Sequence, residues 1–219
     1  MLWNALRGLW RPGPAIDETR WIVLDVEASG LDAARDRLLA IAAVAVRFDD
    51  PARPAVALGD SFEVVLRQGD SQAVADKANI LLHGIGVGAQ RAGVAPDQAL
   101  RDFAAYAGRS PLVGFHVFFD RTLIERGLDA AGLVRPANPW LDLEPLAAVL
   151  HPEVKARALD EWMAYFGIRC GVRHQAAADT LATAELLLRL WPALLRQAGT
   201  PDFAAAARVA AQRRWLKPS

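Results

Sequence analysis

The chain has little of several features that mark common classes of protein. It contains one cysteine, Cys170, which excludes an internal disulfide and fits a reducing compartment, and it has no Cys/His spacing typical of zinc sites. No apolar run reaches the roughly 18 residues that a membrane span needs, and the opening residues are too interrupted for a secretory signal. The charge is balanced, with 25 basic and 25 acidic residues. The chain therefore has no overall positive charge of the kind that predicts extended contacts with an anionic polymer. We expect a cytoplasmic protein that does not bind membranes.

The remaining composition is that of one globular domain. With 219 residues, 53% of them hydrophobic, the chain can bury a sizeable core. We predict an N-terminal helix and linker over residues 1–20, a main domain over residues 21–198, and a basic helical tail over residues 199–219 that packs on or beside the domain. The first helix carries Trp3 and Trp10 beside a leucine stripe, so it packs back on the domain or, alternatively, docks on a protein partner.

Hydrophobic periodicity predicts an α/β layer fold with a mixed sheet. An apolar, β-branched run within residues 21–30 is the expected central strand, and a short turn makes the next strand, residues 38–48, antiparallel to it. Further strands are expected over residues 61–66, after a proline-containing loop, and over residues 111–115. Helical patterns are expected over residues 96–107, from about 120 to 131, from 141 onward, over 159–166, over about 176–197 with an interruption or end near Pro192, and over 202–215.

Two carboxylates interrupt the expected central strand. Asp25 and Glu27 are two residues apart, so their side chains project from the same face of the strand, just before a Ser29-Gly30 turn. Like charges on a half-buried surface repel, and desolvating each one costs several kcal/mol, so a cationic group is expected between them, with a metal ion as the simplest candidate. The alternative is that Glu27 turns to solvent while Asp25 caps a neighbouring backbone.

Acidic and imidazole groups recur at other predicted strand ends and helix starts. His174 and Asp179 are five residues apart, about 140° around a helix, so they cannot share a helical face. His174 is therefore expected in a loop before the helix that carries Asp179, where an exposed imidazole suits a proton acceptor. Asp120 is either a site residue or the cap of its helix, and Asp179 is either a site residue or an exposed charge. Asp142 is expected to be a helix N-cap, and His116 is expected to be structural.

Three segments occur in an order typical of one enzyme family. Residues 25–31, Asp-Val-Glu-Ala-Ser-Gly-Leu, are followed by residues 112–120, Leu-Val-Gly-Phe-His-Val-Phe-Phe-Asp, and by residues 174–179, His-Gln-Ala-Ala-Ala-Asp. Together they resemble the motifs of the DEDD exonucleases, in the DEDDh (DnaQ-like) branch that has a histidine in its third motif. The tripeptide at residues 83–85, His-Gly-Ile, also falls where that family often has it, and the similarity extends over about residues 20–190.

The resemblance implies a fold, a reaction and a set of site residues. The fold is that of ribonuclease H-like proteins, an α/β fold with a mixed five-stranded sheet flanked by helices and with the first strand central. The expected reaction is the hydrolysis of phosphodiester bonds at the 3′ ends of single-stranded DNA or RNA, which releases nucleoside monophosphates. By the same resemblance, two Mg²⁺ or Mn²⁺ ions bind to Asp25, Glu27, Asp120 and Asp179, and His174 is the general base.

The chain departs from the family's pattern beside these residues. Ala-Ser at positions 28–29 stands where the family usually has Thr-Thr, and Phe-His at positions 115–116 stands where it usually has His-Asn. Of the three phenylalanines at positions 115, 118 and 119, at least two are expected to pack in the core. The expected substrate-binding residues lie around these departures and are Ala28, Ser29, Gly30, Leu31, Phe115 and Phe119.

Two other functions fit the same motifs. A catalytically weak or inactive exonuclease fold would serve as an adaptor or binding subunit of a polymerase or another nucleic-acid enzyme. An endonuclease of the broader ribonuclease H-like fold would cut circular single strands, whereas an exonuclease needs a free end. No motif in the chain reads a 2′-hydroxyl, so the sequence does not separate DNA from RNA as the substrate.

Overall fold

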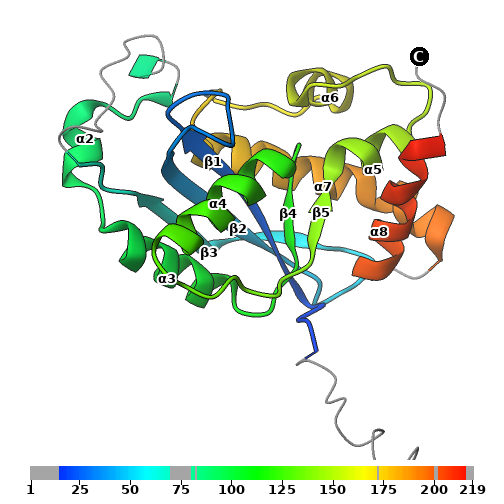
Figure 1. Ribbon diagram of the computed structural model, residues 1–219. Coiled ribbons are helices and arrows are strands. Elements are labelled where there is room, and N and C mark those ends of the chain that lie inside the picture. The colour runs from blue at the N-terminus through cyan, green and yellow to red at the C-terminus, as the bar shows by residue number, and fades with distance from the viewer. Residues whose placement is uncertain (1–14, 70–79, 82, 172, 200–201, 216–219) are drawn as a thin grey trace, which may run out of the picture.

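The first apolar run forms the central strand of a five-stranded sheet in the computed structural model. This strand, β1 (Arg20–Ala28), pairs antiparallel with β2 (Leu38–Arg47), and β2 pairs antiparallel with β3 (Ala55–Val65). On the other side of β1, β4 (Leu112–Gly114) and β5 (Trp140–Asp142) run parallel to it. The sheet order is β3-β2-β1-β4-β5 (Figure 1). The expected mixed five-stranded sheet with a central first strand is therefore confirmed.

β1 is buried on both faces because its side chains alternate between two cores. Trp21 and Val23 point into one apolar cluster, whereas Ile22, Leu24 and Val26 point into the other. A strand that is apolar at successive positions is typical of a sheet covered on both sides. The sheet is therefore the middle one of three layers.

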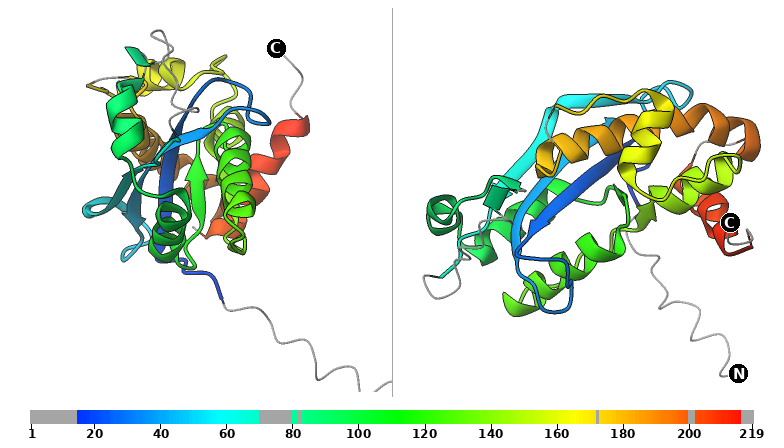
Figure 2. Two further views of the ribbon diagram at one scale, coloured as in Figure 1. Left: turned by 60° about the vertical axis from the view of Figure 1, so that its left-hand side comes forward. Right: turned by 90° about the horizontal axis from the view of Figure 1, so that it is seen from above.

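Helices form the two outer layers (Figure 2). α3 and α4 pack on one face of the sheet, where Leu100 and Phe103 are fully buried against Ile22. On the opposite face α7 lies along β1 and β2, and α5, α6 and α8 contribute to the same cluster as Trp21. The helices are α2 (Val87–Ala92), α3 (Pro96–Ala107), α4 (Phe118–Ala130), α5 (Leu143–Leu150), α6 (Leu159–Phe166), α7 (Ala176–Ala198), α8 (Phe203–Ala210) and the 3₁₀ helix η1 (Ala211–Trp215).

α7 continues through Pro192, so the expected interruption or end near that residue is wrong. A proline in a helix interior removes one hydrogen bond and costs about 3 kcal/mol. Leu190, Trp191 and Leu194 are buried around it, and each apolar side chain of this size contributes about 1.5–3 kcal/mol on burial. Trp191 also donates from Nε1 to the carbonyl oxygen of Pro51 at 2.8 Å. These tertiary contacts outweigh the cost of the proline.

β3 and β5 differ from the sequence-based expectation for physical reasons. β3 begins at Ala55, inside the proline-containing loop that the sequence predicts before residue 61. The sequence pattern misses this first part of the strand because a register shift in the pairing of β3 with β2 breaks the alternation that marks a strand. β5 has three residues, too few for alternation to be recognised, and it replaces the start of the helix expected from residue 141. α5 follows at Leu143, and the Asp142 side chain accepts a hydrogen bond from the Glu144 N–H at 3.0 Å. The expected role of Asp142 as an N-cap is confirmed.

The segment after α7 packs on the same side of the sheet as α7. α8 buries Phe203 and Val209, and the Phe203 ring lies edge-on to the Trp21 ring, with centroids 5.4 Å apart. In η1, Arg213 lies 3.6 Å from Glu144 of α5. This basic helical segment therefore extends the core beside α5.

The expected N-terminal helix, with Trp3 and Trp10, lies outside the residues that the structure describes. Within the described ranges, no helix combines the length and the apolar character needed to cross a membrane. The described residues are 15–69, 80–81, 83–171, 173–199 and 202–215.

Candidate active site

The two carboxylates of β1 lie at the carboxyl end of the central strand. Asp25 and Glu27 are half-buried and point to the face covered by α7, whereas Val26 between them points into the opposite core. β4 ends beside them at Gly114, where an added Cβ would lie 3.2 Å from the carbonyl oxygen of Leu24. The missing side chain lets the start of the next helix, α4, lie close to β1.

α4 brings a third carboxylate to this strand end. Asp120 is 4% exposed, and its Oδ1 accepts a hydrogen bond from the Val26 N–H at 3.1 Å. The N-cap of α4 is Val117, so the alternative that Asp120 caps its helix is wrong. The bond fixes the Asp120 carboxylate against the backbone that joins Asp25 to Glu27.

The start of α7 brings a fourth carboxylate. Asp179 is 6% exposed, so the alternative that it is an exposed charge is wrong. The His174 N–H donates to Asp179 Oδ2 at 3.1 Å, and Arg173 forms an ion pair with Asp179 Oδ1. His174 is exposed in the loop before α7, as expected, and its φ of 61° is left-handed. The hydrogen bond to its backbone holds this loop at the start of the helix.

A cavity of about 170 Å³ joins these elements. Three of the four expected metal-binding carboxylates and the expected general base line it. Asp120 lies outside the lining and is connected to it through its hydrogen bond to Val26. The residues that line the cavity are Asp25, Val26, Glu27, Ala28, Gly30, Leu31, Phe119, His174 and Asp179.

Two of the expected substrate-binding residues, Ser29 and Phe115, are not in this lining. The Ser29 hydroxyl donates to Asp36 Oδ1 at 2.9 Å and accepts from the Arg37 N–H at 2.9 Å, so it braces the loop after β1. A Cβ at Gly30 would lie 2.5 Å from Asp36 Oδ2, so a side chain there would displace the Asp36 carboxylate that binds Ser29. Phe115 packs against the core on the α7 side. Both residues support the site without facing it.

An open depression adjoins the cavity on the side of the loop after β1. Leu31 and Phe119 line both, and Phe118 and Thr122 of α4 line the depression. Leu31 is 92% exposed and Phe118 is 78% exposed. Phe115 and Phe119 pack against the core, as expected for at least two of the three phenylalanines. Phe118, the first residue of α4, is the one of the three that faces solvent.

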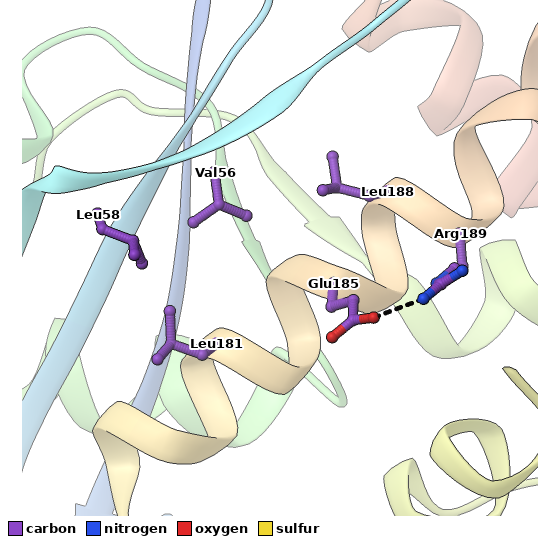
Figure 3. A pocket seen from close by; sticks show the side chains of 6 residues that line it. All are labelled: Val56, Leu58, Leu181, Glu185, Leu188 and Arg189. Carbon is purple, nitrogen blue, oxygen red and sulfur yellow. Dashed lines mark hydrogen bonds and ion pairs between the residues drawn. The ribbon is translucent and has the colours of Figure 1, made fainter. Parts of the chain in front are cut away.

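A separate groove lies away from the carboxylates, between β3 and α7 (Figure 3). None of the expected site residues lines it. Glu185 and Arg189, at one end of the groove, form an ion pair at 2.8 Å on the surface of α7. The groove is lined by Val56, Leu58, Leu181, Glu185, Leu188 and Arg189.

The sequence profile of a known family covers the elements that build the cavity. The profile, described as Exonuclease and named for RNase T, matches residues 22–187, from β1 into α7. The chain belongs to this exonuclease family. The match contains every residue that lines the cavity, together with Asp120.

Several curated proteins similar to this exonuclease domain are DNA polymerases. The DNA polymerase III PolC-type of Halalkalibacterium halodurans is 29% identical over 177 residues, which cover 81% of this chain and 12% of that protein. The protein of the same name from Bacillus subtilis is 29% identical over 178 residues, which cover 80% of this chain and 12% of that protein. The exonuclease domain thus spans about an eighth of the length of these relatives.

Solved structures of nucleases share the fold of the exonuclease domain. E. coli exonuclease I in complex with a dT13 oligonucleotide superposes with a TM-score of 0.67 at 20% identity, over 83% of this chain and 44% of that one. Cell-death related nuclease 4 superposes with a TM-score of 0.68 at 15% identity, over 84% of this chain and 66% of that one. The expected ribonuclease H-like fold is confirmed.

The carboxylates of the exonuclease domain are in an environment that disfavours their charge. Burial raises the pKa of Asp25 well above its ordinary value, and the charges of Asp120, Glu27 and Asp179 raise it further. Burial and the charge of Asp179 raise the pKa of Glu27 to about 8, and burial raises the pKa of Asp120 to about 7. Arg173 acts in the opposite direction on Asp25 and Glu27. The site therefore favours protons or added cations.

The donor set of the cavity suits a hard divalent cation. Its carboxylate oxygens are the ligands that Mg²⁺ and Mn²⁺ prefer, and burial together with their mutual repulsion raises the pKa values of Asp25 and Glu27, which a nearby cation would lower. In the part of the chain that the structure describes, no three His, Cys, Asp or Glu side chains are already gathered in the arrangement of a metal site. Asp179 has Arg173 as its cationic partner in this arrangement. The residues fit the cation chemically, and binding it requires them to draw together.

The raised pKa values predict that the metal-free exonuclease domain loses stability as the pH rises. Glu27 has a pKa of about 8 when folded and an ordinary value of 4.5, so the folded state holds a proton that the unfolded state releases between these pH values. The free energy of unfolding is then highest near pH 4.5 and falls toward pH 8. We expect the melting temperature in EDTA to fall by about 6–12 °C between pH 5.5 and pH 8, because keeping one proton over this range is worth about 3 kcal/mol and about 1 kcal/mol corresponds to 2–4 °C in a domain of this size.

Glu27→Gln is the matched variant for this measurement. Its amide stays neutral throughout the range, so its melting temperature should fall less steeply with pH than that of the unchanged domain. A melting temperature that rises from pH 5.5 to pH 8 in the unchanged domain would show that Glu27 is not desolvated as described.

Proposed function

We propose that this exonuclease domain removes nucleotides from the 3′ end of single-stranded DNA or RNA with the help of two Mg²⁺ or Mn²⁺ ions. The observation that carries the proposal is the single cavity in which Asp25, Glu27 and Asp179, from two distant segments, meet His174 and the apolar Phe119. Acidic oxygens, an exposed imidazole and an aromatic wall are the groups that hydrolysis of a phosphodiester at a strand end requires.

We assign the acidic residues to the metal ions and the histidine to the proton. Asp25, Glu27, Asp120 and Asp179 would hold the ions, which in such sites stabilise the charge on the attacking and leaving oxygens. His174 accepts the proton of the attacking water, for which its exposed loop position is suited. Hydrogen bonds from the Val26 and His174 N–H groups orient Asp120 and Asp179 before the cations draw the four carboxylates together.

The apolar part of the cavity lining is assigned to the terminal nucleotide. Phe119 and Leu31 offer apolar surfaces beside the acidic residues, and stacking of a base on an aromatic ring contributes about 1–3 kcal/mol. Ala28 carries only a methyl group and Gly30 has no side chain, which leaves room for the sugar and phosphate. Stacking is independent of the base, so we expect little preference for sequence at the 3′ end.

The polymerase relatives support a role in which the domain acts together with a DNA polymerase. The domain is similar to a segment of DNA polymerase III PolC-type proteins, so a newly made strand end is a reasonable source of its substrate. In that setting the domain would act with a polymerase partner, and catalysis itself would still use the cavity described above.

A labelled oligonucleotide tests the reaction and its direction. A single strand with a label at its 5′ end, incubated with the full chain and Mn²⁺, should yield a ladder of shorter labelled strands. The same strand labelled at its 3′ end should release labelled mononucleotide at once. Matched DNA and RNA strands compare the two substrates in the same assay.

Three results would contradict the proposal. Cutting of a circular single strand would indicate an endonuclease. Immediate release of mononucleotide from the 5′-labelled strand would reverse the direction. An absence of any product, with binding to a polymerase retained, would favour an adaptor with the exonuclease fold.

A further inference from the structure

Arg173 places a positive charge at the edge of the acidic cavity. Its guanidinium forms ion pairs with two carboxylates at once, through Nε with Asp160 at the start of α6 and through Nη1 with Asp179 in the first turn of α7. The Asp160 side chain is 61% exposed, whereas that of Asp179 is 9% exposed. Arg173 thus connects a solvent-facing acid with a buried one.

The two oxygens of Asp179 have different partners. Oδ2 accepts the His174 N–H at 3.1 Å, a bond that belongs to the turn leading into α7. Oδ1 forms the ion pair with Arg173, and the Cys170 thiol lies 3.9 Å from the same oxygen. Because Oδ2 already accepts the bond from His174, Oδ1 is the more available oxygen for a cation, and it is the oxygen that Arg173 occupies.

The charge of Arg173 also reaches the carboxylates of β1. It lowers the pKa of Asp25 and of Glu27, while the neighbouring acids raise both. It thus supplies part of the positive charge that a metal ion would bring to the same group of oxygens.

We propose that Arg173 is an internal counter-ion that competes with the divalent cation for Asp179, so that metal binding requires the Arg173–Asp179 ion pair to open. The inference deepens the proposed function, on which it rests. Asp160 gives the displaced guanidinium a partner outside the cavity, because it is exposed and already bonded to Arg173. The balance between Asp160 and Asp179 as partners of Arg173 then sets how readily the site takes up metal.

Two substitutions should shift metal affinity in opposite directions. In Arg173→Gln the competing charge is gone, so the full chain should bind Mn²⁺ about tenfold more tightly in a calorimetric titration at pH 7.5. In Asp160→Asn the outside partner is weakened and Arg173 stays on Asp179, so Mn²⁺ should bind more weakly than to the unchanged chain. A general loosening of the loop would shift both variants in the same direction.

A matched control and a second measurement keep the test decisive. Arg189→Gln removes an arginine from an exposed ion pair on α7, the helix that carries Asp179, and should leave Mn²⁺ affinity unchanged (Figure 3). In EDTA at pH 8, Arg173→Gln should melt at a lower temperature than the unchanged chain, because the buried carboxylates lose their counter-charge.

The outcomes separate this inference from the function on which it rests. If the unchanged chain binds Mn²⁺ and Arg173→Gln binds it equally or more weakly, the competition is refuted and the metal-dependent function stands. If neither folded protein binds Mn²⁺, the metal-dependent function itself is refuted.

Discussion

Asp25→Asn is expected to lower the rate of 3′-end hydrolysis by about 10³-fold or more while the fold is retained. Asparagine has nearly the same shape as aspartate, so the packing at the end of β1 is preserved. Asparagine lacks the negative charge of Asp25, to which we assign the binding of metal among the four carboxylates. The measurement is the single-turnover rate on a 5′-labelled single strand with saturating Mn²⁺.

At high pH, where Asp25 would be ionised, the same substitution should make the metal-free domain more stable. Burial and three neighbouring acids disfavour the charge of Asp25, and a neutral amide removes that repulsion. The expected pair of effects, lost activity with a higher melting temperature in EDTA, is typical of a functional residue held in an unfavourable environment. General misfolding would lower both activity and melting temperature.

Asp129→Asn is the matched control for Asp25→Asn. Asp129 is an exposed acid on α4 that pairs with Arg135 on the protein surface, outside the lining of the cavity. Its rate should equal that of the unchanged chain. If Asp25→Asn retained more than about a tenth of the activity, the assignment of Asp25 to the metal centre would be wrong.

His174→Asn is expected to reduce hydrolysis by about 10²–10⁴-fold, which is the usual contribution of a general base. The φ of His174 is 61°, and asparagine tolerates this left-handed conformation better than most residues. The substitution therefore removes the imidazole while its backbone N–H can still bind Asp179. Mn²⁺ affinity should stay the same, so the loss should appear in the hydrolysis rate alone.

His116→Asn is a close control for His174→Asn. His116 is also exposed, also has a left-handed φ of 60°, and its N–H donates to Asp142 at 2.9 Å. It does not line the cavity, so its substitution should leave the rate nearly unchanged. Equal losses in the two variants would mean that the loops, and not the imidazole of His174, determine the rate.

The parts of the site that could be predicted from sequence are those with a local signal. Asp25 and Glu27 break a strand at a spacing of two, which places them on one face before any tertiary contact is known. His174 and Asp179 have a spacing that separates loop from helix. The order of the three motifs then predicts the fold that brings Asp120 to the same strand end.

The remaining features depend on contacts between distant segments. The register shift in β3 hides half of that strand, and the three residues of β5 are too few to show a period. Pro192 stays within α7 because Trp191 is buried, and local helix propensity gives no information about that burial. The ion pairs of Arg173 with Asp160 and Asp179 join the starts of two helices, and their sequence spacings of 13 and 6 carry no recognised pattern.

We propose that the carboxylates at the end of β1 gather around divalent cations together with those of α4 and α7. The most direct measurement is the anomalous scattering of Mn²⁺ in crystals of the full chain grown with the ion. The account predicts Mn²⁺ inside the cavity, within about 2.0–2.3 Å of oxygens of Asp25 and its acidic neighbours. Mn²⁺ found only elsewhere on the protein, with the cavity empty and Arg173 still on Asp179, would contradict it.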